Sequence, residues 1–430
     1  TLHYTDGRCD RIQTPWQDAE NCIRFKYENG ALVKIRHEDN RASEYVYNEE
    51  IIRKHMDAVA KVITKYPYTA NYSVKANTNI HILKLALEEG NNCDAMSIGE
   101  IRMLQKAGFP TDRIFYVPNN VSEEELKETI SIGVMTSLDS LAQLELYGSL
   151  NPGGKCAVRL NPGVGAGHHE KVVTAGKKTK FGIAEEDIDQ IFEIAARYQL
   201  TIAGINQHIG SLFMDPEPYL KAVSNLLRIA ERFPNLEFID FGGGYGIPYH
   251  KLDDEAEFDM ESFRQRLVPI LDQFVAEYGK APLFKSEPGR YCVAEGSVIL
   301  GRVHAVKQNA GKKYVGTDVG MNVLVRPSMY DSWHDIEVLR NGQVVPRTDM
   351  EEQTVTGNIC ESGDLLAKDR MLPQIQRGDL ACILDTGAYG YSMCSSYNSR
   401  PRPAEVMICK DGSVKLIRRR ETIEDLMAYM

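Results

Sequence analysis

The feature that most constrains the fold is a regular alternation of short apolar runs and amphipathic segments, which begins at about residue 45. The amphipathic segments, such as IDQIFEIAARYQ and SFRQRLVPILDQFVAEYG, carry apolar residues at steps of three and four, as one face of a helix does. Runs that are apolar almost throughout are typical of parallel strands buried on both faces. Eight such runs separated by helices predict a (β/α)8 barrel, whose chemistry lies at the carboxyl ends of its strands. The runs are NYSVKA, NCDAMS, RIFYVP, GVMTSLD, KCAVRLN, IAGINQHIG, EFIDFGG and LFKSEPG.

After about residue 295 this alternation stops and β-rich runs replace it, among them SVILGRVHAVKQ and DLACILDTGAYG. KDGS predicts a hairpin through Asp411 and Gly412, and the opening segment IRFKYENGALVKIRH carries a second such turn at Asn29 and Gly30. We therefore predict an α/β barrel followed by a second, all-β domain that resembles a β-barrel. The predicted domains are residues 45–294 for the barrel, and residues 1–44 together with 295–430 for the β-rich domain.

Composition narrows the class of protein. A chain of 430 residues is too long for one ordinary core, so two domains are expected. The net charge of -10 argues against a nucleic-acid partner, and no apolar run is long enough to span a bilayer. Nine cysteines without a CxxC pair indicate reduced thiols. We expect a cytoplasmic enzyme of small molecules; because the chain begins at Thr1, a removed organelle transit peptide stays an alternative.

Polar and glycine-rich residues gather at the ends of four predicted barrel strands. Taken alone, a lysine at a strand end more often reaches solvent, and a single histidine is more often a core residue. A glycine run is also weak evidence by itself, but phosphate groups often lie at the loops after strands seven and eight of such barrels. The residues are Lys75 after the first strand, His208 and Ser211 after the sixth, Gly242, Gly243 and Gly244 after the seventh, and Glu287 and Arg290 after the eighth.

These strand ends together predict a site for pyridoxal 5'-phosphate. This cofactor needs a phosphate cradle, an amine that forms an imine with its aldehyde, and a carboxylate that keeps its ring nitrogen protonated. Lys75 would supply the amine, Glu287 the carboxylate, and His208 a flat group against the ring. We expect no metal.

Long motifs also make the chain similar to a known family. It resembles the fold III pyridoxal-phosphate decarboxylases over residues 45–410, and within them most closely the diaminopimelate decarboxylase branch. The motifs are YSVKANTN, RLNPGVGAGHHEKVVTAGKKTKFGI, HIGS, FGGGYGIPY, EPGRY, DVGMNVLVRPSMY, CESGDLLAKDRMLP and GAYGYSMCSSYNSRPRPAEV.

The resemblance implies roles for individual residues. Lys75 would carry the cofactor, and Cys360 would donate the proton that replaces the lost carboxylate. Cys360 and Glu361 would enter the neighbouring subunit's site, so that the enzyme is an obligate homodimer and the β-rich domain contributes to its active site. The other cofactor contacts would be His208, Ser211, Gly243, Gly244, Glu287, Pro288, Gly289, Arg290 and Tyr389.

By the same resemblance, the positive charge of Arg326 would select the substrate. Relatives that act on diamines carry an acidic residue at this position, whereas a guanidinium binds a carboxylate through two hydrogen bonds and repels an ammonium. This implies a substrate with a second carboxylate. The substrate contacts would be Arg290, Arg326, Tyr330, Glu361 and Tyr389.

By this resemblance the reaction is decarboxylation of meso-2,6-diaminopimelate to L-lysine and carbon dioxide, the last step of lysine biosynthesis. A related decarboxylase of ornithine, lysine or arginine, of either hand, is the first alternative. The second is a non-catalytic homologue that binds the cofactor and acts through a partner. Two residues differ from the usual motifs of the diaminopimelate decarboxylase branch. Tyr291 stands where serine is more frequent, and Ile98 stands where glycine is usual. Residues 1–44 resemble nothing that we recognise.

Overall fold

The structure is a computed structural model that describes residues 43–161, 163 and 180–430, together with the backbone of four strands in the first 42 residues. The turn predicted at Asn29 and Gly30, and most of the motif that starts at Arg159, lie outside the described residues. The four early strands form an antiparallel sheet of their own. They are β1 (Leu2–Thr5), β2 (Arg8–Ile12), β3 (Ile23–Glu28) and β4 (Ala31–His37).

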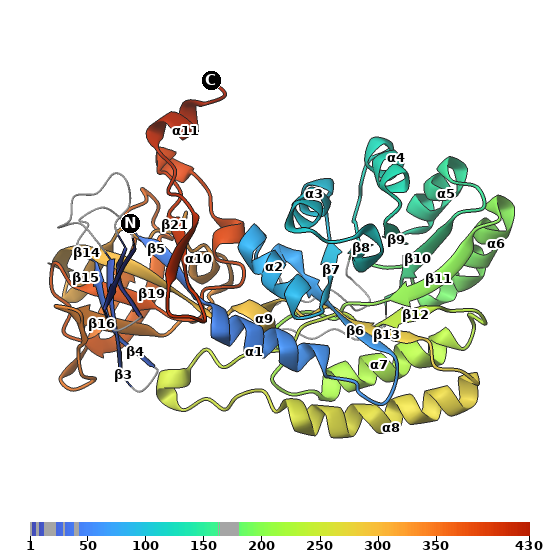
Figure 1. The fold of residues 1–430 in the computed structure, drawn as a ribbon, viewed down its shortest axis with the longest axis horizontal. Helices are drawn as coiled ribbons and strands as arrows, with labels where there is room; N and C mark the ends of the chain where they lie inside the picture. Colours follow the sequence, from blue (N-terminus) through green and yellow to red (C-terminus); the bar gives the residue numbers. More distant parts are fainter. Residues whose placement is uncertain are drawn as a thin grey trace. The chain divides into compact units, whose positions relative to one another are not determined.

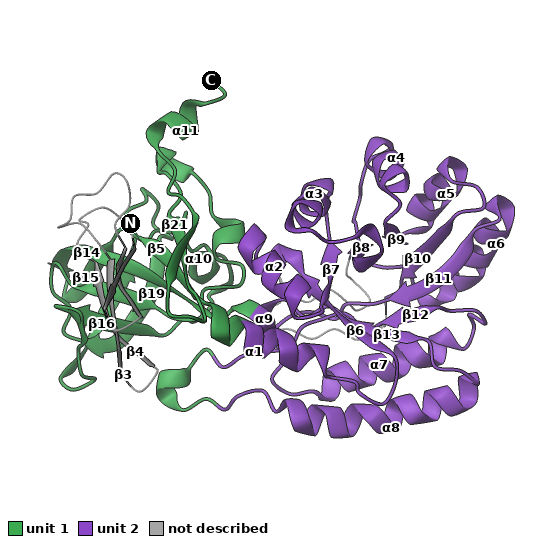
Figure 2. Ribbon diagram, viewed as in Figure 1, with its two compact units in different colours: residues 1–52, 249–255, 293–430 green, residues 53–248, 256–292 purple. Residues whose placement is uncertain are grey.

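The chain divides into two compact units, which Figure 2 distinguishes by colour. Unit 1 contains residues 1–52, 249–255 and 293–430, and unit 2 contains residues 53–248 and 256–292. The sequence suggested divisions at residues 45 and 295, and it gave no sign that the short segment 249–255 groups with the β-rich part.

Unit 2 is a closed barrel of parallel strands, which confirms the predicted (β/α)8 architecture. Each of the eight apolar runs forms one strand, in the cyclic order β10-β11-β12-β13-β6-β7-β8-β9. The strands are β6 (Tyr68–Ser73), β7 (Asn92–Ala95), β8 (Ile114–Tyr116), β9 (Met135–Leu138), β10 (Lys155–Arg159), β11 (Thr201–Asn206), β12 (Phe238–Asp240) and β13 (Leu283–Ser286).

Helices follow the strands and surround the barrel (Figure 1). Their ends are set by local chemistry: α4 begins with a capping box between Ser122 and Glu125, and it ends at Gly133 in the left-handed conformation. The interior of the barrel includes Phe115 and Phe238, whose rings meet edge to face at 5.3 Å. The helices are α1 (Glu49–Ala60), α2 (Ile80–Glu88), α3 (Ile98–Ala107), α4 (Glu123–Ile132), α5 (Leu141–Leu150), α6 (Ile188–Tyr198), α7 (Glu217–Ala230), α8 (Met260–Tyr278) and α9 (Arg290–Val293).

Unit 1 is built on a ten-stranded sheet, which confirms the predicted β-rich second domain. The hairpin predicted at Asp411 and Gly412 joins β21 to β22. The strands are β5 (Glu44–Asn48), β14 (Ser297–Asn309), β15 (Lys312–Thr317), β16 (Ile336–Arg340), β17 (Gln343–Val344), β18 (Met350–Thr356), β19 (Leu365–Pro373), β20 (Leu380–Ile383), β21 (Ala404–Ile408) and β22 (Val414–Arg418). Two short helices, α10 (Arg326–Tyr330) and α11 (Ile423–Met427), complete the unit.

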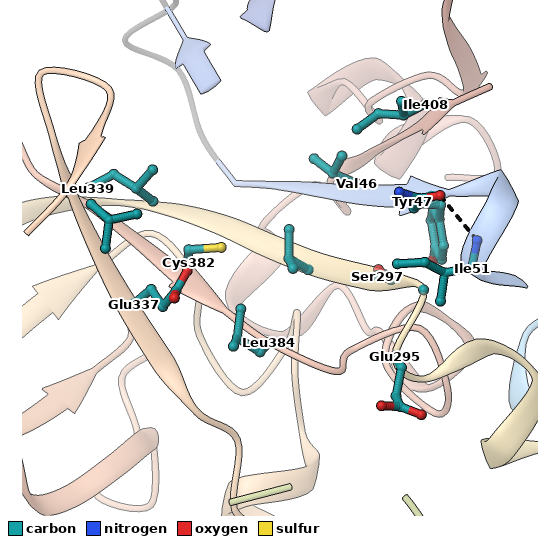
Figure 3. A pocket seen from close by; sticks show the side chains of 14 residues that line it. Val46, Tyr47, Ile51, Glu295, Ser297, Glu337, Leu339, Cys382, Leu384 and Ile408 are labelled. Carbon is teal, nitrogen blue, oxygen red and sulfur yellow. Dashed lines mark hydrogen bonds between the residues drawn. The ribbon is translucent and has the colours of Figure 1, made fainter. Parts of the chain in front are cut away.

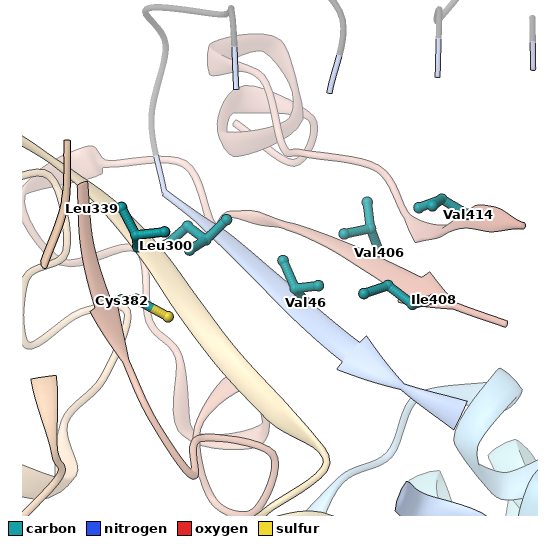
Figure 4. Close-up of a cluster of buried hydrophobic side chains, with 7 residues drawn as sticks. All are labelled: Val46, Leu300, Leu339, Cys382, Val406, Ile408 and Val414. Carbon is teal, nitrogen blue, oxygen red and sulfur yellow. The ribbon is translucent and has the colours of Figure 1, made fainter. Parts of the chain in front are cut away.

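Strand β5 belongs to this sheet and not to the barrel. It lies between β14, with which it pairs antiparallel, and β21, with which it pairs parallel. Figure 4 shows the apolar cluster that results, in which Val46 of β5 packs with side chains from β14, β16, β20, β21 and β22. Burial of Val46 therefore ties the start of the described chain to the C-terminal part of the sheet.

Within the described residues, none of the helices is both long and apolar enough to span a bilayer.

Candidate active site

Lys75 follows β6 directly, in a single 3-10 turn formed by residues 74–76. The turn lies beside buried polar groups, since Ser73 donates a hydrogen bond of 3.0 Å to the carboxylate of Asp94 at the end of β7. Burial raises the pKa of Asp94 to about 7, while the charge of Lys75 and the Ser73 hydroxyl act to lower it. The amine therefore lies near a carboxyl group whose charge changes near neutral pH.

His208 follows β11 and is a neutral hydrogen-bond acceptor. Its Nδ1 accepts from the backbone N–H of Gly243 at 3.3 Å, so a neutral ring carries its proton on Nε2. Burial holds the pKa of His208 well below its usual range, and the positive charges of Lys75 and Arg159 lower it further. A flat, uncharged imidazole thus lies among charged groups.

The glycine loop after β12 lets two strand-end loops approach closely. Gly242 and Gly244 have φ values of +74° and +118°, which favour glycine. A Cβ at Gly243 would collide with the carbonyl oxygen of Glu287 after β13. The N–H of Gly242 donates to Asp240 at 2.9 Å, and that of Gly243 donates to His208, so the described donors of these two glycines are directed at side chains.

Ser211 and Arg290 join the loops after β11 and β13. The Nε and Nη2 groups of Arg290 donate to Ser211 Oγ at 3.2 Å and 3.0 Å. Arg290 is the first residue of α9, and its side chain is buried. A guanidinium and a hydroxyl placed in this way can bind one anionic group together.

Glu287 is a buried carboxyl group with one unsatisfied oxygen. Only 4% of the residue is exposed, and Oε1 has no hydrogen-bond partner in the described part of the chain. Burial, with the charges of Asp240 and Asp94, raises the pKa of Glu287 well above its usual range; Lys75 and Arg159 oppose this rise. Since an unsatisfied buried acceptor is costly, this oxygen calls for a donor from a ligand.

Pro288 and Gly289 complete the EPGRY loop. The carbonyl oxygen of Pro288 accepts from the N–H of Ser73 at 2.9 Å, which joins this loop to the turn that carries Lys75. The carbonyl oxygen of Gly289 accepts from the N–H of Cys292 at 3.2 Å, so it closes the first turn of α9. Both residues act here through the backbone.

Two buried charged residues of this site are absent from the sequence-based list. Asp94 is the third residue of β7, within the run NCDAMS, and Arg159 is the last residue of β10, within the run KCAVRLN. Burial lowers the pKa of Arg159, and the carboxylates of Glu287, Asp139 and Asp94 act to raise it. A charged residue within an apolar run was the only mark that either left in the sequence.

The remaining predicted residues belong to unit 1. Arg326, the first residue of α10, is the largest fully buried side chain described, with 2% exposed. Tyr330 ends the same helix and is partly buried. Tyr389 is also partly buried and has a φ of +58°, an uncommon backbone conformation for a tyrosine.

Cys360 and Glu361 lie at the surface of unit 1, in the loop between β18 and β19. The loop is held from inside by Asp364, whose carboxylate accepts from the N–H of Ile359 at 2.8 Å and of Met321 at 2.6 Å. The N–H of Cys360 donates to the side chain of Asn398 at 2.7 Å. An exposed thiol and an exposed carboxylate are thus presented on a fixed loop.

Unit 1 contains cavities in addition to these residues. A pocket of about 220 Å³, drawn in Figure 3, is lined largely by apolar side chains and contains none of the predicted site residues. A second cavity of about 460 Å³ is bordered by Pro327 and Ser328 of α10, by Ser332, and by residues of β19. The α10 region therefore borders open space even though Arg326 itself is buried.

Comparisons with known proteins agree with this arrangement. A family model described as the pyridoxal-dependent decarboxylase, pyridoxal binding domain, matches residues 48–294. A diaminopimelate decarboxylase of Methanothermobacter thermautotrophicus is 41% identical over 392 residues, covering 89% of this chain and 90% of that protein. One of Escherichia coli K12 is 33% identical over 423 residues, covering 95% and 96%. The crystal structure of diaminopimelate decarboxylase from Helicobacter pylori complexed with L-lysine has a TM-score of 0.82 and 30% identity, covering 90% of this chain and 96% of that one.

Proposed function

The chain belongs to the diaminopimelate decarboxylases, pyridoxal-phosphate-dependent carboxy-lyases, and from this premise we propose that it converts meso-2,6-diaminopimelate to L-lysine and carbon dioxide. This would make it the enzyme of the last step of lysine biosynthesis. The neighbour from Helicobacter pylori was crystallised with L-lysine, which is the product that the proposal expects. A cytoplasmic setting is part of the proposal, because the described cysteines are free thiols.

The observation that carries the proposal is the unsatisfied oxygen of Glu287. A protonated pyridine nitrogen is a donor that would satisfy Glu287 Oε1, and pyridoxal phosphate has such a nitrogen. Arg290 and Ser211 suit the phosphate, since a guanidinium and a hydroxyl are both good partners for it. The residues present therefore fit the cofactor.

The chain's own groups divide the work at the barrel site. When bound, the cofactor withdraws the electron pair that remains after the carboxylate departs. Lys75 would hold its aldehyde covalently through Nζ, and Glu287 would hold the ring nitrogen. His208, kept neutral by burial, would lie against the ring without adding a positive charge beside Lys75. The close packing of Gly243 on Glu287 keeps the loops after β12 and β13 in contact.

Arg326 and Tyr330 would bind the carboxylate that is retained. A guanidinium at this position favours a carboxylate over an ammonium, so a diacid is preferred to ornithine or lysine. Holding the L centre of a meso substrate in this way would direct the D carboxylate to the reacting position. The proposed substrate choice thus depends on one fixed positive charge.

A homodimer is the second part of the proposal, with Cys360 and Glu361 entering the partner's site. Its support is that both side chains are exposed on a loop held by the buried Asp364. The Cys360 thiol would deliver the proton that replaces the lost carboxylate. Because the residues of one site would come from two subunits, mixtures of inactive variants can test the arrangement.

The first experiment is a substrate panel. The native protein is expected to release carbon dioxide from meso-diaminopimelate and to form L-lysine, with little release from L-ornithine, D-ornithine, lysine or arginine. In Arg326→Gln the KM for meso-diaminopimelate should rise about 10- to 100-fold, the range expected for loss of a charged hydrogen-bonding partner. Release from ornithine alone by the native protein would overturn the proposal.

The second experiment mixes two variants, Lys75→Ala and Cys360→Ala. Each alone should be nearly inactive. If sites are shared, random reassortment gives half of the dimers as hybrids with one intact site each, so about one quarter of native activity should return. No recovery after verified subunit exchange would contradict the shared site but would leave the assignment of the reaction standing.

A further inference from the structure

The guanidinium of Arg326 donates hydrogen bonds to three side chains of unit 1. None of the three has a role in the proposed reaction as given above. Its Nη1 donates to Tyr249 Oη at 3.1 Å and to His334 Nε2 at 2.9 Å, and its Nη2 donates to Ser332 Oγ at 3.3 Å. The centre of the guanidinium also lies 5.1 Å from the centre of the Tyr249 ring. We call Tyr249, Ser332 and His334 the neutral clamp.

His334 has a single protonation state that suits this arrangement. A guanidinium donates only, so His334 Nε2 must accept and carries no proton. The other ring nitrogen, Nδ1, lies 2.8 Å from the carbonyl oxygen of Leu384 and must therefore donate to it. His334 is fully buried and neutral in this geometry. None of the three acceptors is charged, so these contacts set the direction of the guanidinium without neutralising it.

Hydrogen bonds and a ring contact join the segments of unit 1 that carry the clamp. The N–H of Leu384 donates back to the carbonyl oxygen of Asp335 at 2.9 Å, next to the pairing of β16 with β20. The Asp335 carboxylate accepts from the N–H of Leu252 at 2.9 Å, which ties segment 249–255 to the residues after α10. The rings of His250 and Trp333 stack at 4.1 Å between the same two segments. Tyr249 and His334 are thus held in a fixed relation.

We propose that Tyr249, Ser332 and His334 are positioning residues for substrate selection: they fix the orientation in which the Arg326 guanidinium meets a carboxylate. This inference rests on the proposed function, in which Arg326 binds the distal carboxylate. Both N–H groups of Nη1 are taken by Tyr249 and His334, so a carboxylate that bridged Nη1 and Nη2 would have to displace the clamp. Ser332 also borders the cavity of about 460 Å³, so the clamp reaches from the buried arginine to open space.

The clamp should raise discrimination between substrates more than it raises turnover. A guanidinium that can rotate loses part of its advantage for a planar carboxylate, because orientation must then be restricted on binding. The cofactor contacts lie on other residues, so loading of the cofactor should not change. Loss of the clamp is therefore expected in KM and not in kcat.

The decisive variants all change His334 in the holoenzyme. His334→Phe keeps a ring but removes the acceptor, His334→Gln places an acceptor near the position of Nε2, and His334→Asn can replace only the donor to Leu384. We expect His334→Phe and His334→Asn to raise the KM for meso-diaminopimelate about 5- to 100-fold, the range for a buried donor that loses its partner. His334→Gln should restore the native KM to within about threefold, and kcat should change little in all three.

Tyr249→Phe keeps the proposal testable if the His334 variants fold poorly. It removes one hydroxyl and keeps the ring, and it should raise KM about threefold or more. Inhibition by pimelate, a dicarboxylate without amines, gives a second readout, since its advantage over hexanoate should shrink in the same order as KM rises. Thermal unfolding and cofactor absorbance should stay close to those of the native protein.

The outcomes distinguish a failure of the clamp from a failure of the proposed function. If Arg326→Gln raises KM while His334→Phe, His334→Asn and Tyr249→Phe all leave it unchanged, the clamp is wrong and the proposed function stands. A His334→Gln variant as impaired as His334→Phe would also overturn the acceptor role. If the native protein does not act on meso-diaminopimelate, or Arg326→Gln has the native KM, the proposed function fails and the clamp fails with it.

Discussion

Two groups of buried charged residues, one in each unit, are held in different ways. In the barrel, the carboxyl groups of Asp94, Asp240 and Glu287 are close enough to affect one another, and burial raises the pKa of each. In unit 1, the permanent charge of Arg326 is held by neutral acceptors. Groups whose protonation shifts easily suit the movement of protons and electrons, whereas a fixed charge suits recognition. Barrel variants should therefore change kcat, and variants around Arg326 should change KM.

The largest effect is expected for Lys75→Ala, which removes the amine that would hold the cofactor. Carbon dioxide release should fall by at least about 10³-fold, as when the nucleophile of a covalent mechanism is removed. Lys61→Ala is the matched control, because Lys61 is an exposed lysine on unit 2. Retention of more than a tenth of the activity by Lys75→Ala would contradict the role of Lys75 as the amine that holds the cofactor.

Glu287→Gln comes next, since it removes the carboxylate but keeps the shape of the side chain. We expect kcat to fall by about 10²-fold with a smaller change in KM, because electrostatic support at the reacting centre is lost. Steady-state kinetics at saturating cofactor measure both constants. Glu277→Gln on α8, where the side chain is exposed, should behave as the native protein does. An effect of Glu287→Gln on KM alone would contradict the expectation that barrel variants change kcat and variants around Arg326 change KM.

Asp94→Asn tests the raised pKa through stability. A carboxyl group whose pKa rises from 3.8 when unfolded to about 7 when folded stabilises the protein below pH 3.8, and this contribution is lost as the pH rises towards 7. Within this window the free energy of unfolding of the cofactor-free native protein should fall more steeply, by about 1.4 kcal/mol per pH unit, than that of Asp94→Asn. Urea unfolding at pH 5 and pH 7 measures the difference.

The control for that experiment is Asp57→Asn, which changes a half-exposed carboxylate on α1. Its pH dependence should match that of the native protein. An identical slope in Asp94→Asn and the native protein would show that burial of this carboxyl group is not coupled to folding.

The smallest effect is expected for Glu185→Gln on the outside of the barrel. Glu185 pairs with Arg228 through two hydrogen bonds of 2.8 Å and 2.7 Å, and both side chains are substantially exposed. Such pairs contribute at most about 1 kcal/mol, so thermal unfolding should shift by only a few degrees while kcat and KM stay unchanged. A loss of activity here would mean that distant surface charge affects the site.

The sequence was sufficient for the barrel because its signal is local. Each strand is an apolar run and each helix has its own period, so strand order followed once eight runs had been counted. Strand β5 was missed because EYVYN carries no mark of its partners; its place depends on β14 and β21, which lie more than 240 residues away in sequence. Pairing at such distances is decided by packing and not by propensity.

The residues of the candidate site also divide into those that local sequence predicted and those that only the structure brought together. Lys75 was predicted because it ends an apolar run before a polar turn, and Glu287 because it opens the EPGRY loop. Asp94 and Arg159 stand within ordinary runs, and their burial became evident only in the structure. The clamp around Arg326 could not be predicted from the sequence either, since Tyr249 precedes Arg326 by 77 residues. Its members meet only because segment 249–255 belongs to unit 1.

That assignment has a practical consequence for anyone who wishes to produce the barrel alone. The polypeptide passes between the units at four places, after residues 52, 248, 255 and 292. A gene fragment that encodes residues 53–292 would include a heptapeptide whose anchors, Asp335 among them, had been deleted. Excising the barrel cleanly would require a short linker in place of residues 249–255, and the remaining half would then lack Tyr249.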